Sequence, residues 1–144
     1  MKARGFTLVE IMVVVGILAL LMSFSIPNFL RARSNTTEVL AITSAQTVGR
    51  ACQNFYSQVQ PHSYPDSLAV LSTSNPPYID SVLGSGQKQG YQFAYTFQDT
   101  EHFQIQAQPV IPGVNGNRFF FLDQTGVLRV RQGGPAGPGD NPVE

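Results

Sequence analysis

Residues 6–26 read FTLVEIMVVVGILALLMSFSI, an apolar run in which Glu10 is the only charged side chain. Such a run is long enough to cross the hydrocarbon core of a bilayer, which is roughly 30 Å thick. A carboxylate inside that core costs about 2.5–3.5 kcal/mol, and less near the end of a helix. The run therefore predicts a membrane segment, and Glu10 is the residue in it that needs a functional explanation.

The residues alone leave three interpretations of this run open. A membrane anchor that tolerates Glu10 near the interface is the first. A cleaved secretory signal is the second, because Lys2 and Arg4 precede the run and Ser23-Phe24-Ser25 carries small side chains near its end; the apolar part of such signals is usually about 7–15 residues long. A buried core helix is the third, and the length of the run disfavours it. The two basic residues place the leader in the cytoplasm and the rest of the chain outside.

The run and its flanks also resemble a known family. Gly5-Phe6-Thr7-Leu8-Val9-Glu10, with a basic leader before it and Pro27 after the apolar run, resembles the processing site of type IV pilins and type II secretion pseudopilins. The resemblance implies that a prepilin peptidase cleaves between Gly5 and Phe6 and methylates the new amine of Phe6. It also implies a leader at residues 1–5 and a transmembrane and filament-core helix at residues 6–30.

Glu10 receives a role through the same resemblance. In that family the glutamate at this position is thought to neutralise the N-terminal amine of a neighbouring subunit during assembly. Cleavage makes the amine of Phe6 cationic, and opposite charges attract strongly in a low-dielectric surrounding. The resemblance therefore implies that Glu10 favours the filament over the bilayer. Pairing of Glu10 with the amine of its own chain stays open as the alternative.

Gly16 in the run and Pro27 directly after it are expected to interrupt a regular helix. Pro27 lacks a backbone N–H and predicts a kink at residues 25–28. Gly16 is a second flexible point, and its lack of a side chain permits close contact between helices. A filament core that stretches at Gly16 and Pro27 is implied by the resemblance, and plain irregularity is the alternative.

Beyond the run, apolar side chains recur mostly at spacings of three and four, which predicts an amphipathic helix from residue 31 to about residue 59. These side chains are Val39, Ile42, Ala45, Val48, Cys52, Phe55, Tyr56 and Val59. Arg31 and Arg33 stand at its beginning, where they suit anionic lipid headgroups or an acid of a neighbouring subunit. A face that simply meets water is the alternative.

The second half of the chain alternates between apolar and polar side chains, which predicts strands at residues 91–97, 102–108, 118–123 and 127–130. One face of the resulting sheet is apolar and must be covered by the amphipathic helix. The predicted class is α+β: a pilin fold in which a long N-terminal helix packs on an antiparallel sheet of about four strands. Residues 31–131 form the globular head, and the Gly- and Pro-rich residues 132–144 are expected to be a flexible tail.

The composition favours a structural protein. Nine basic and nine acidic side chains give a formal net charge of zero, so no basic patch for specific nucleic-acid binding is expected. The single Cys52 is interpreted as a small buried apolar residue, and His62 and His102 lack the spacing of metal ligands. The acidic residues are too dispersed for the calcium loop of some pseudopilins. We expect no catalytic residues, metal or cofactor.

The predicted function is a structural subunit of a type IV pilus, inserted in the bacterial inner membrane with its head in the periplasm. By the resemblance, its partners are the prepilin peptidase, other pilin subunits, membrane lipid, and an inner-membrane assembly platform with its ATPase. A type II secretion pseudopilin in a periplasmic pseudopilus is the alternative. A membrane-anchored extracytoplasmic binding domain is the more remote one. The sequence does not choose between motility, adhesion, DNA uptake and secretion, or between a major and a minor subunit.

Overall fold

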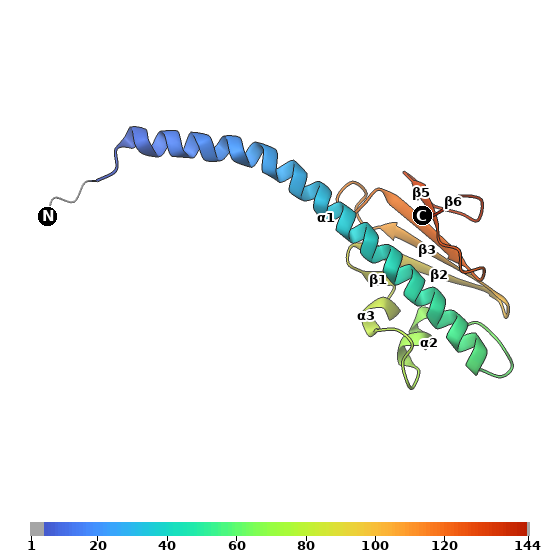
Figure 1. The fold of residues 1–144 in the computed structure, drawn as a ribbon. Coiled ribbons are helices and arrows are strands. Elements are labelled where there is room, and N and C mark those ends of the chain that lie inside the picture. The colour runs from blue at the N-terminus through green and yellow to red at the C-terminus, as the bar shows by residue number, and fades with distance from the viewer. Residues whose placement is uncertain (1–4, 144) are drawn as a thin grey trace. The chain divides into compact units, whose positions relative to one another are not determined.

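The computed structural model describes residues 5–143, and its main elements are one long helix and one antiparallel sheet (Figure 1). The chain divides into two compact units, Met1–Arg33 and Ser34–Glu144. The helices are α1 (Leu8–Gln58), α2 (Leu68–Thr73) and α3 (Ser81–Gly84). The strands are β1 (Gln87–Lys88), β2 (Tyr91–Asp99), β3 (His102–Pro109), β4 (Arg118–Asp123), β5 (Arg129–Gln132) and β6 (Asn141–Pro142). The α+β class predicted from the sequence is confirmed.

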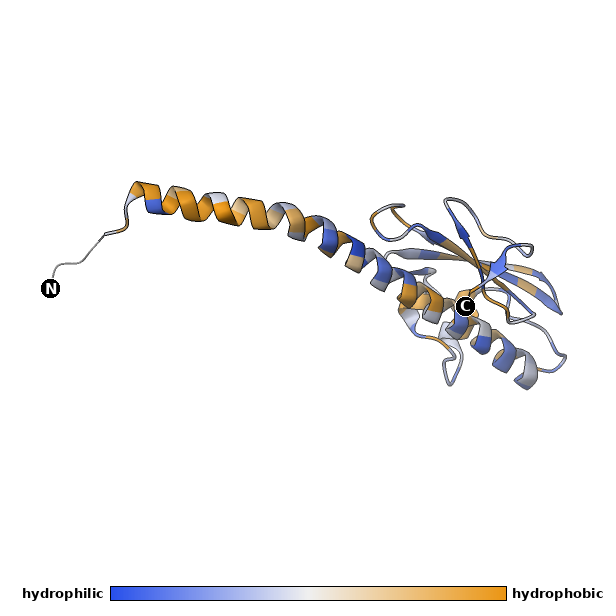
Figure 2. Cartoon of the chain, turned by 45° about the horizontal axis from the view of Figure 1, so that its top comes forward, coloured by the Kyte–Doolittle hydropathy of each residue, from blue (hydrophilic) through white to orange (hydrophobic). Residues whose placement is uncertain are grey.

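The first unit contains the apolar half of α1. Every large apolar side chain from Phe6 to Leu30 is exposed, and this half of the helix is coloured as hydrophobic nearly throughout in Figure 2. Helical structure continues through Pro27. By length and composition, α1 is the helix of the described residues that could cross a membrane. A surface so apolar on all sides is typical of a helix surrounded by lipid or by other apolar helices.

The second unit contains the remaining half of α1, which buries one stripe of side chains. Ala41, Ala45, Val48 and Cys52 are each less than 5% exposed. Their spacings of three and four residues place them on one face of the helix. Mostly small residues on this face allow the helix to lie close to the sheet, which it crosses in Figure 1.

The sheet has six strands in the order β1-β2-β3-β4-β5-β6, and every neighbouring pair is antiparallel. The expected four strands correspond to β2–β5, so the predicted number of about four is corrected to six. The additional strands β1 and β6 contain two residues each. Two residues are too few to show an alternation of apolar and polar side chains, which is why the sequence pattern missed them.

The core of the head lies between α1 and one face of the sheet. The register pairs Tyr95 with Ile105 and Ile105 with Leu122, so alternate residues of β2, β3 and β4 share that face. The largest buried side chains of this core are Tyr91, Phe93, Phe103, Ile105, Phe120 and Leu122 from the sheet, and Leu68, Leu71 and Leu83 from the segment that contains α2 and α3.

The segment after β5, for which the sequence predicts a flexible tail, contains β6 and folds back on the sheet. The backbone N–H of Val143 donates to the carbonyl of Leu128 at 2.8 Å. The Arg129 guanidinium donates to the carbonyl of Asp140 at 3.0 Å, and the Asp140 carboxylate accepts from the backbone N–H of Gly137 at 2.8 Å. These bonds hold most of residues 132–143 in a defined conformation, although the segment has few apolar side chains.

Candidate functional site

The first turn of α1 contains Glu10 and is held by a pair of reciprocal contacts with Thr7. The Thr7 hydroxyl accepts a hydrogen bond from the backbone N–H of Glu10 at 3.2 Å. The Glu10 carboxylate accepts from the backbone N–H of Thr7 at 3.3 Å and from the Thr7 hydroxyl at 3.4 Å. Because Thr7 directly precedes the helix and Glu10 follows three residues later, this is a capping box.

The capping box gives Glu10 a structural role inside its own chain. It satisfies backbone N–H groups that the first turn of a helix otherwise leaves unpaired, and it places a negative charge where the helix dipole favours one. Sequence reasoning missed this role, although the Thr-x-x-Glu spacing of residues 7–10 carries the signal. The carboxylate therefore lies at the beginning of the helix, close in the chain to the bond between Gly5 and Phe6.

The predicted cleavage position lies in an accessible segment. Gly5 and Phe6 precede α1 without helical structure, and Phe6 is 80% exposed. A side-chain carbon added to Gly5 would meet no atom within 4 Å. The basic leader residues Lys2 and Arg4 lie outside the described residues. A peptidase binds a peptide bond that is exposed and non-helical, as the bond between Gly5 and Phe6 is here.

The predicted flexible points lie farther along the same helix. Gly16 has open space where a side-chain carbon would stand. Pro27 lies inside α1, with helical residues on both sides. The structure thus places these two residues in the exposed apolar half, separated along α1 from the Thr7–Glu10 capping box.

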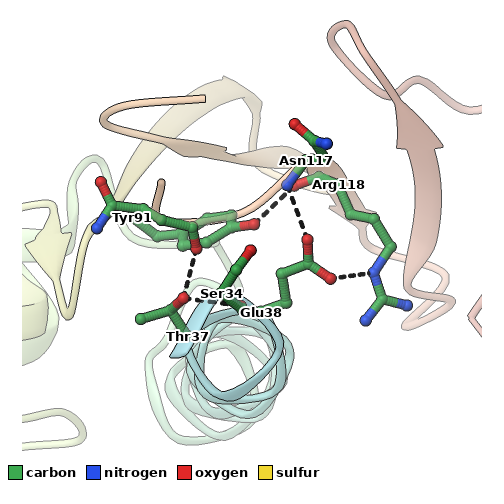
Figure 3. Close-up of polar contacts among 7 residues, drawn as sticks. Ser34, Thr37, Glu38, Tyr91, Asn117 and Arg118 are labelled. Carbon is green, nitrogen blue, oxygen red and sulfur yellow. Dashed lines mark hydrogen bonds and ion pairs between the residues drawn. The ribbon is translucent and has the colours of Figure 1, made fainter. Parts of the chain in front are cut away.

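A second acidic residue of α1, Glu38, holds the β3–β4 connection of the head (Figure 3). Glu38 is 6% exposed, and its carboxylate accepts from the backbone N–H of Asn117 at 2.7 Å. It also accepts from the Arg118 guanidinium at 2.5 Å, which makes an ion pair between a buried carboxylate and a half-buried guanidinium. One residue earlier in the helix, the Thr37 hydroxyl donates to the backbone carbonyl of Asn115. Five groups from two distant segments are therefore joined here.

Gly116 completes this arrangement by its lack of a side chain. A carbon added to it would lie 2.2 Å from the Tyr91 hydroxyl oxygen and 2.8 Å from Glu38 Cγ, both too close for any side chain. The Tyr91 hydroxyl donates to the carbonyl of Arg118 at 2.9 Å. Sequence reasoning missed the role of Glu38, because its partner Arg118 is 80 residues away and carries no local signal.

Cys52 is fully buried against the sheet and has no disulfide partner. Burial raises the pKa of its thiol to about 12. Burial also raises the pKa of the Tyr95 hydroxyl, which donates to the carbonyl of Pro65 at 2.6 Å. Because the thiolate is the reactive form of cysteine, Cys52 behaves as a packing residue.

The two histidines lie at the surface of the head in separate polar contacts. His62 Nδ1 lies 2.8 Å from the carbonyl of Tyr56, and His102 Nδ1 lies 2.7 Å from the Asp99 carboxylate. The pKa of that carboxyl is lowered, first by the backbone N–H of Glu101 and then by His102. Among residues 5–143, no three His, Cys, Asp or Glu side chains come together as a metal site would require.

Comparison with known proteins relates the chain to pilins. Residues 1–26 match the family model of the prokaryotic N-terminal methylation motif. The chain is 35% identical over 62 residues to the type IV major pilin protein of Myxococcus xanthus, which is 43% of this chain and only 28% of that protein. It is 35% identical over 94 residues to the type IV wide pilus major component of Thermus thermophilus, covering 62% of this chain and 70% of that one.

A third relative comes from a secretion system. The chain is 30% identical over 91 residues to the type II secretion system core protein G of Escherichia coli, covering 62% of this chain and 61% of that one. No solved structure matches the chain significantly. The match to the Thermus component extends well beyond the methylation motif and into the head. The chain therefore belongs to the family of type IV pilins and type II secretion pseudopilins, a family of structural subunits.

Proposed function

We propose that this chain is a structural subunit of a type IV pilus, assembled from the bacterial inner membrane into a helical filament. The observation that carries the proposal is the exposed apolar surface of α1 between Phe6 and Leu30. An apolar surface of this extent requires a cover of lipid or protein. Lipid covers it while the subunit spans the membrane, and the same segments of other subunits cover it in the filament.

Processing precedes assembly in this proposal. A prepilin peptidase cleaves between Gly5 and Phe6 and methylates the amine of Phe6, after which the leader stays in the cytoplasm and the head in the periplasm. The exposed, non-helical geometry of both residues supports access by a peptidase. The match to the methylation motif over residues 1–26 supports the same step.

The capping box suggests how Glu10 could change partners. Before assembly, the Glu10 carboxylate bonds to the N–H and hydroxyl of Thr7, which lowers the cost of a charge near the membrane. Assembly supplies the cationic amine of Phe6 from a neighbouring subunit, and this amine attracts the carboxylate strongly in an apolar surrounding. Gly16 and Pro27 are proposed as the points at which the packed helices bend or stretch.

N-terminal mass analysis of the mature protein tests the processing step. We expect a chain that begins with N-methylated Phe6, because the exposed bond after Gly5 is the proposed cleavage point. A mature chain that begins at Met1 would leave an uncleaved anchor, and one that begins near Ile26 would identify a secretory signal. Either of the latter two results would contradict the proposal.

Replacement of Glu10 tests the assembly step separately. In Glu10→Ala we expect normal cleavage and membrane insertion but loss of filaments, because the charge that attracts the neighbouring amine is gone. Glu10→Gln is the matched control, since it retains the shape and an oxygen acceptor for Thr7 but not the charge. The charge role requires that both variants fail to assemble; assembly of Glu10→Gln at the normal level would reduce Glu10 to its capping role.

A pseudopilin of a type II secretion system is the second candidate function. It is supported by the 30% identity to the type II secretion system core protein G of Escherichia coli. Both candidates require an inner-membrane platform and an ATPase to extract and assemble subunits. Deletion of the gene separates them: loss of surface fibres with normal protein export supports the pilus, and loss of export with normal fibres supports the pseudopilus.

A further inference from the structure

The connection between β3 and β4 exposes aliphatic side chains that the head does not cover. Val110 is 44% exposed, Ile111 is 54% exposed and Val114 is 46% exposed. Residues 109–117 read PVIPGVNGN and contain no charged side chain. We call residues 110–115 the apolar loop. Exposed aliphatic groups gathered on one short loop form a surface that gains free energy by leaving water.

The backbone N–H groups of the apolar loop are satisfied by hydrogen bonds inside the head. The N–H of Val110 donates to the carbonyl of Gly90 at 2.9 Å, and the N–H of Ile111 donates to the Asn115 side chain at 3.2 Å. The N–H groups of Val114 and Asn115 both donate to the carbonyl of Ile111, at 3.2 and 3.0 Å. The N–H of Gly113 donates to the carbonyl of Gly116 at 3.0 Å.

These bonds account for every backbone N–H of residues 110–115, since Pro112 has none. Unpaired backbone N–H and C=O groups both oppose the transfer of an irregular loop into an apolar medium. The N–H groups of the apolar loop and the carbonyls of Ile111 and Asn115 already have partners inside the head, so insertion leaves no backbone donor unpaired. A loop held together only by water would lose those bonds on entering the same medium.

The apolar loop is also hydrogen-bonded to α1 at a residue that follows the membrane segment in the chain. The carbonyl of Asn115 accepts the hydroxyl proton of Thr37, and the next connection residue, Asn117, is bonded to Glu38. Thr37 follows Leu30 by seven positions, a distance of about 10 Å in a helix and at most about 25 Å in an extended chain. The chain between Leu30 and Thr37 is therefore short enough to allow the loop to reach the headgroup layer when residues 6–30 span the bilayer.

We propose that the apolar loop inserts Val110, Ile111 and Val114 into the membrane interface, as a second lipid contact of the subunit before assembly. The inference rests on the membrane-inserted state in the proposed function. Basic Arg31, between the membrane segment and Thr37, suits the anionic headgroups at the same level. The second contact would hold the head against the bilayer surface and would be released when the subunit enters the filament.

A lipid surface fits the apolar loop better than a second copy of the chain does. Lipid requires apolar area and no fixed shape, and the exposed side chains Val110, Ile111 and Val114 carry no polar atom that would fix the orientation of a protein partner. The backbone donors are already used within the head. Contact with a second copy is accordingly an outcome that the experiment must distinguish.

Tryptophan fluorescence provides the test, because the chain contains no tryptophan. Ile111→Trp places a single reporter on the loop at a position that is 54% exposed, so that the head can accommodate it. The full chain is incorporated at low density into phosphatidylglycerol–phosphatidylcholine vesicles, with and without bromine atoms near the tops of the acyl chains. We expect about a twofold loss of fluorescence with brominated lipid, because interfacial groups lie about 5–10 Å deep, next to the bromine atoms.

Two matched reporters make the result decisive. Val82→Trp reports from α3, where the native side chain is also 54% exposed, and should keep its fluorescence. Phe24→Trp reports from the apolar half of α1, about 9 Å along the helix from Leu30 and therefore at the depth of the bromine atoms, and should be quenched. Quenching at Phe24→Trp without quenching at Ile111→Trp overturns the inference and leaves membrane anchoring intact, whereas no quenching at either position overturns anchoring as well.

Two further results would also overturn the inference. Equal quenching at Ile111→Trp and Val82→Trp would show that the whole head lies on lipid without a specific role for the apolar loop. A shift of the Ile111→Trp emission that depends on protein density, and not on bromine, would identify a second copy of the chain as the partner.

Discussion

The two halves of α1 are one helix by hydrogen bonding, but they meet different surroundings. Up to Leu30 the helix exposes every large apolar side chain, whereas beyond Ser34 it buries a stripe that includes Ala41, Val48 and Cys52. A helix that is apolar on all sides needs an apolar solvent, and a helix with one apolar stripe needs one partner. The helix itself therefore does not determine where its residues become buried; the partner of each half does.

The same residue types occur in both halves, which allows the two surroundings to be compared residue by residue. Each half has one glutamate, one glycine and one threonine that can be compared. In or just before the first half these are Glu10, Gly16 and Thr7, and in the second half they are Glu38, Gly49 and Thr37. If the comparison is correct, equal substitutions should disturb the head in the second half and leave its unfolding unchanged in the first.

The largest expected difference concerns thiol reactivity in the buried stripe. Burial raises the pKa of Cys52 from 9.0 to about 12, so that at neutral pH its thiolate fraction is on the order of a thousand-fold lower than that of an unburied thiol. We expect its reaction with a water-soluble disulfide reagent to be slower by at least that factor until the head is unfolded. The stability linked to this thiol is complete below pH 9 and is lost as the pH rises through about 12.

The control for this measurement uses the opposite face of the same helix. Val39, which is 55% exposed, is replaced by cysteine in a Cys52→Ala background. The introduced thiol should react at the rate of a free thiol in the folded protein. Rates for the two positions within tenfold of each other would contradict burial of the stripe.

The next largest effect is expected for the two glutamates. Glu38→Ala leaves Arg118 and the N–H of Asn117 without their acceptor, and should lower the free energy of unfolding of the head by about 3 kcal/mol. The lower end of the range for buried ion pairs applies, because the Arg118 side chain is 33% exposed. Glu38→Gln should cost less, since it keeps an acceptor for Asn117. Denaturant unfolding of the full chain in detergent measures both changes.

Glu10→Ala is the matched substitution in the first half. Its bonds are to Thr7 at the helix start, so the unfolding of the head should stay within about 0.5 kcal/mol of the original chain. If Glu10→Ala and Glu38→Ala lowered the unfolding midpoint equally, the two halves would form one cooperative unit and the comparison would fail.

Glycine gives a smaller contrast. A side-chain carbon at Gly49 would stand 2.4 Å from Leu122 Cδ2, whereas one at Gly16 meets nothing within 4 Å. Gly49→Val should therefore destabilise the head by about 2 kcal/mol through overpacking, and Gly16→Val should not change its unfolding. Thermal unfolding of the two variants side by side measures the difference. A stable head in Gly49→Val would show that Leu122 moves away at little cost.

The sequence predicted the long elements because their periodicity is repeated many times. The stripe of α1 and the alternation in β2 and β3 each contain several turns or several pairs of residues. The short strands β1 and β6 exist through backbone pairing alone, with two residues each, and leave no pattern in the side chains.

The sites divide in the same way between local and distant contacts. The Thr7–Glu10 capping box is formed by four consecutive residues, so the local sequence carries its signal. The ion pair of Glu38 and Arg118 depends on how β4 is placed against α1, and no local pattern encodes that placement. The hydrogen bonds that close the apolar loop likewise become visible only in the structure.

The smallest contrast, between the two threonines, tests whether the ends of α1 melt independently. The Thr37 hydroxyl bonds to the carbonyl of Asn115 in the head, so Thr37→Val should lower the free energy of unfolding of the head by about 1 kcal/mol. Thr7→Val removes the cap of the first turn, which is also worth about 1 kcal/mol, but only where the helix begins. Amide hydrogen exchange separates the two, because a lost cap accelerates exchange in the first turn through local opening, while a lost bond in the head accelerates exchange throughout its core. Faster exchange in the core of Thr7→Val would mean that the apolar half supports the head after all, and the difference in surroundings between the two halves would then not be a difference in stability.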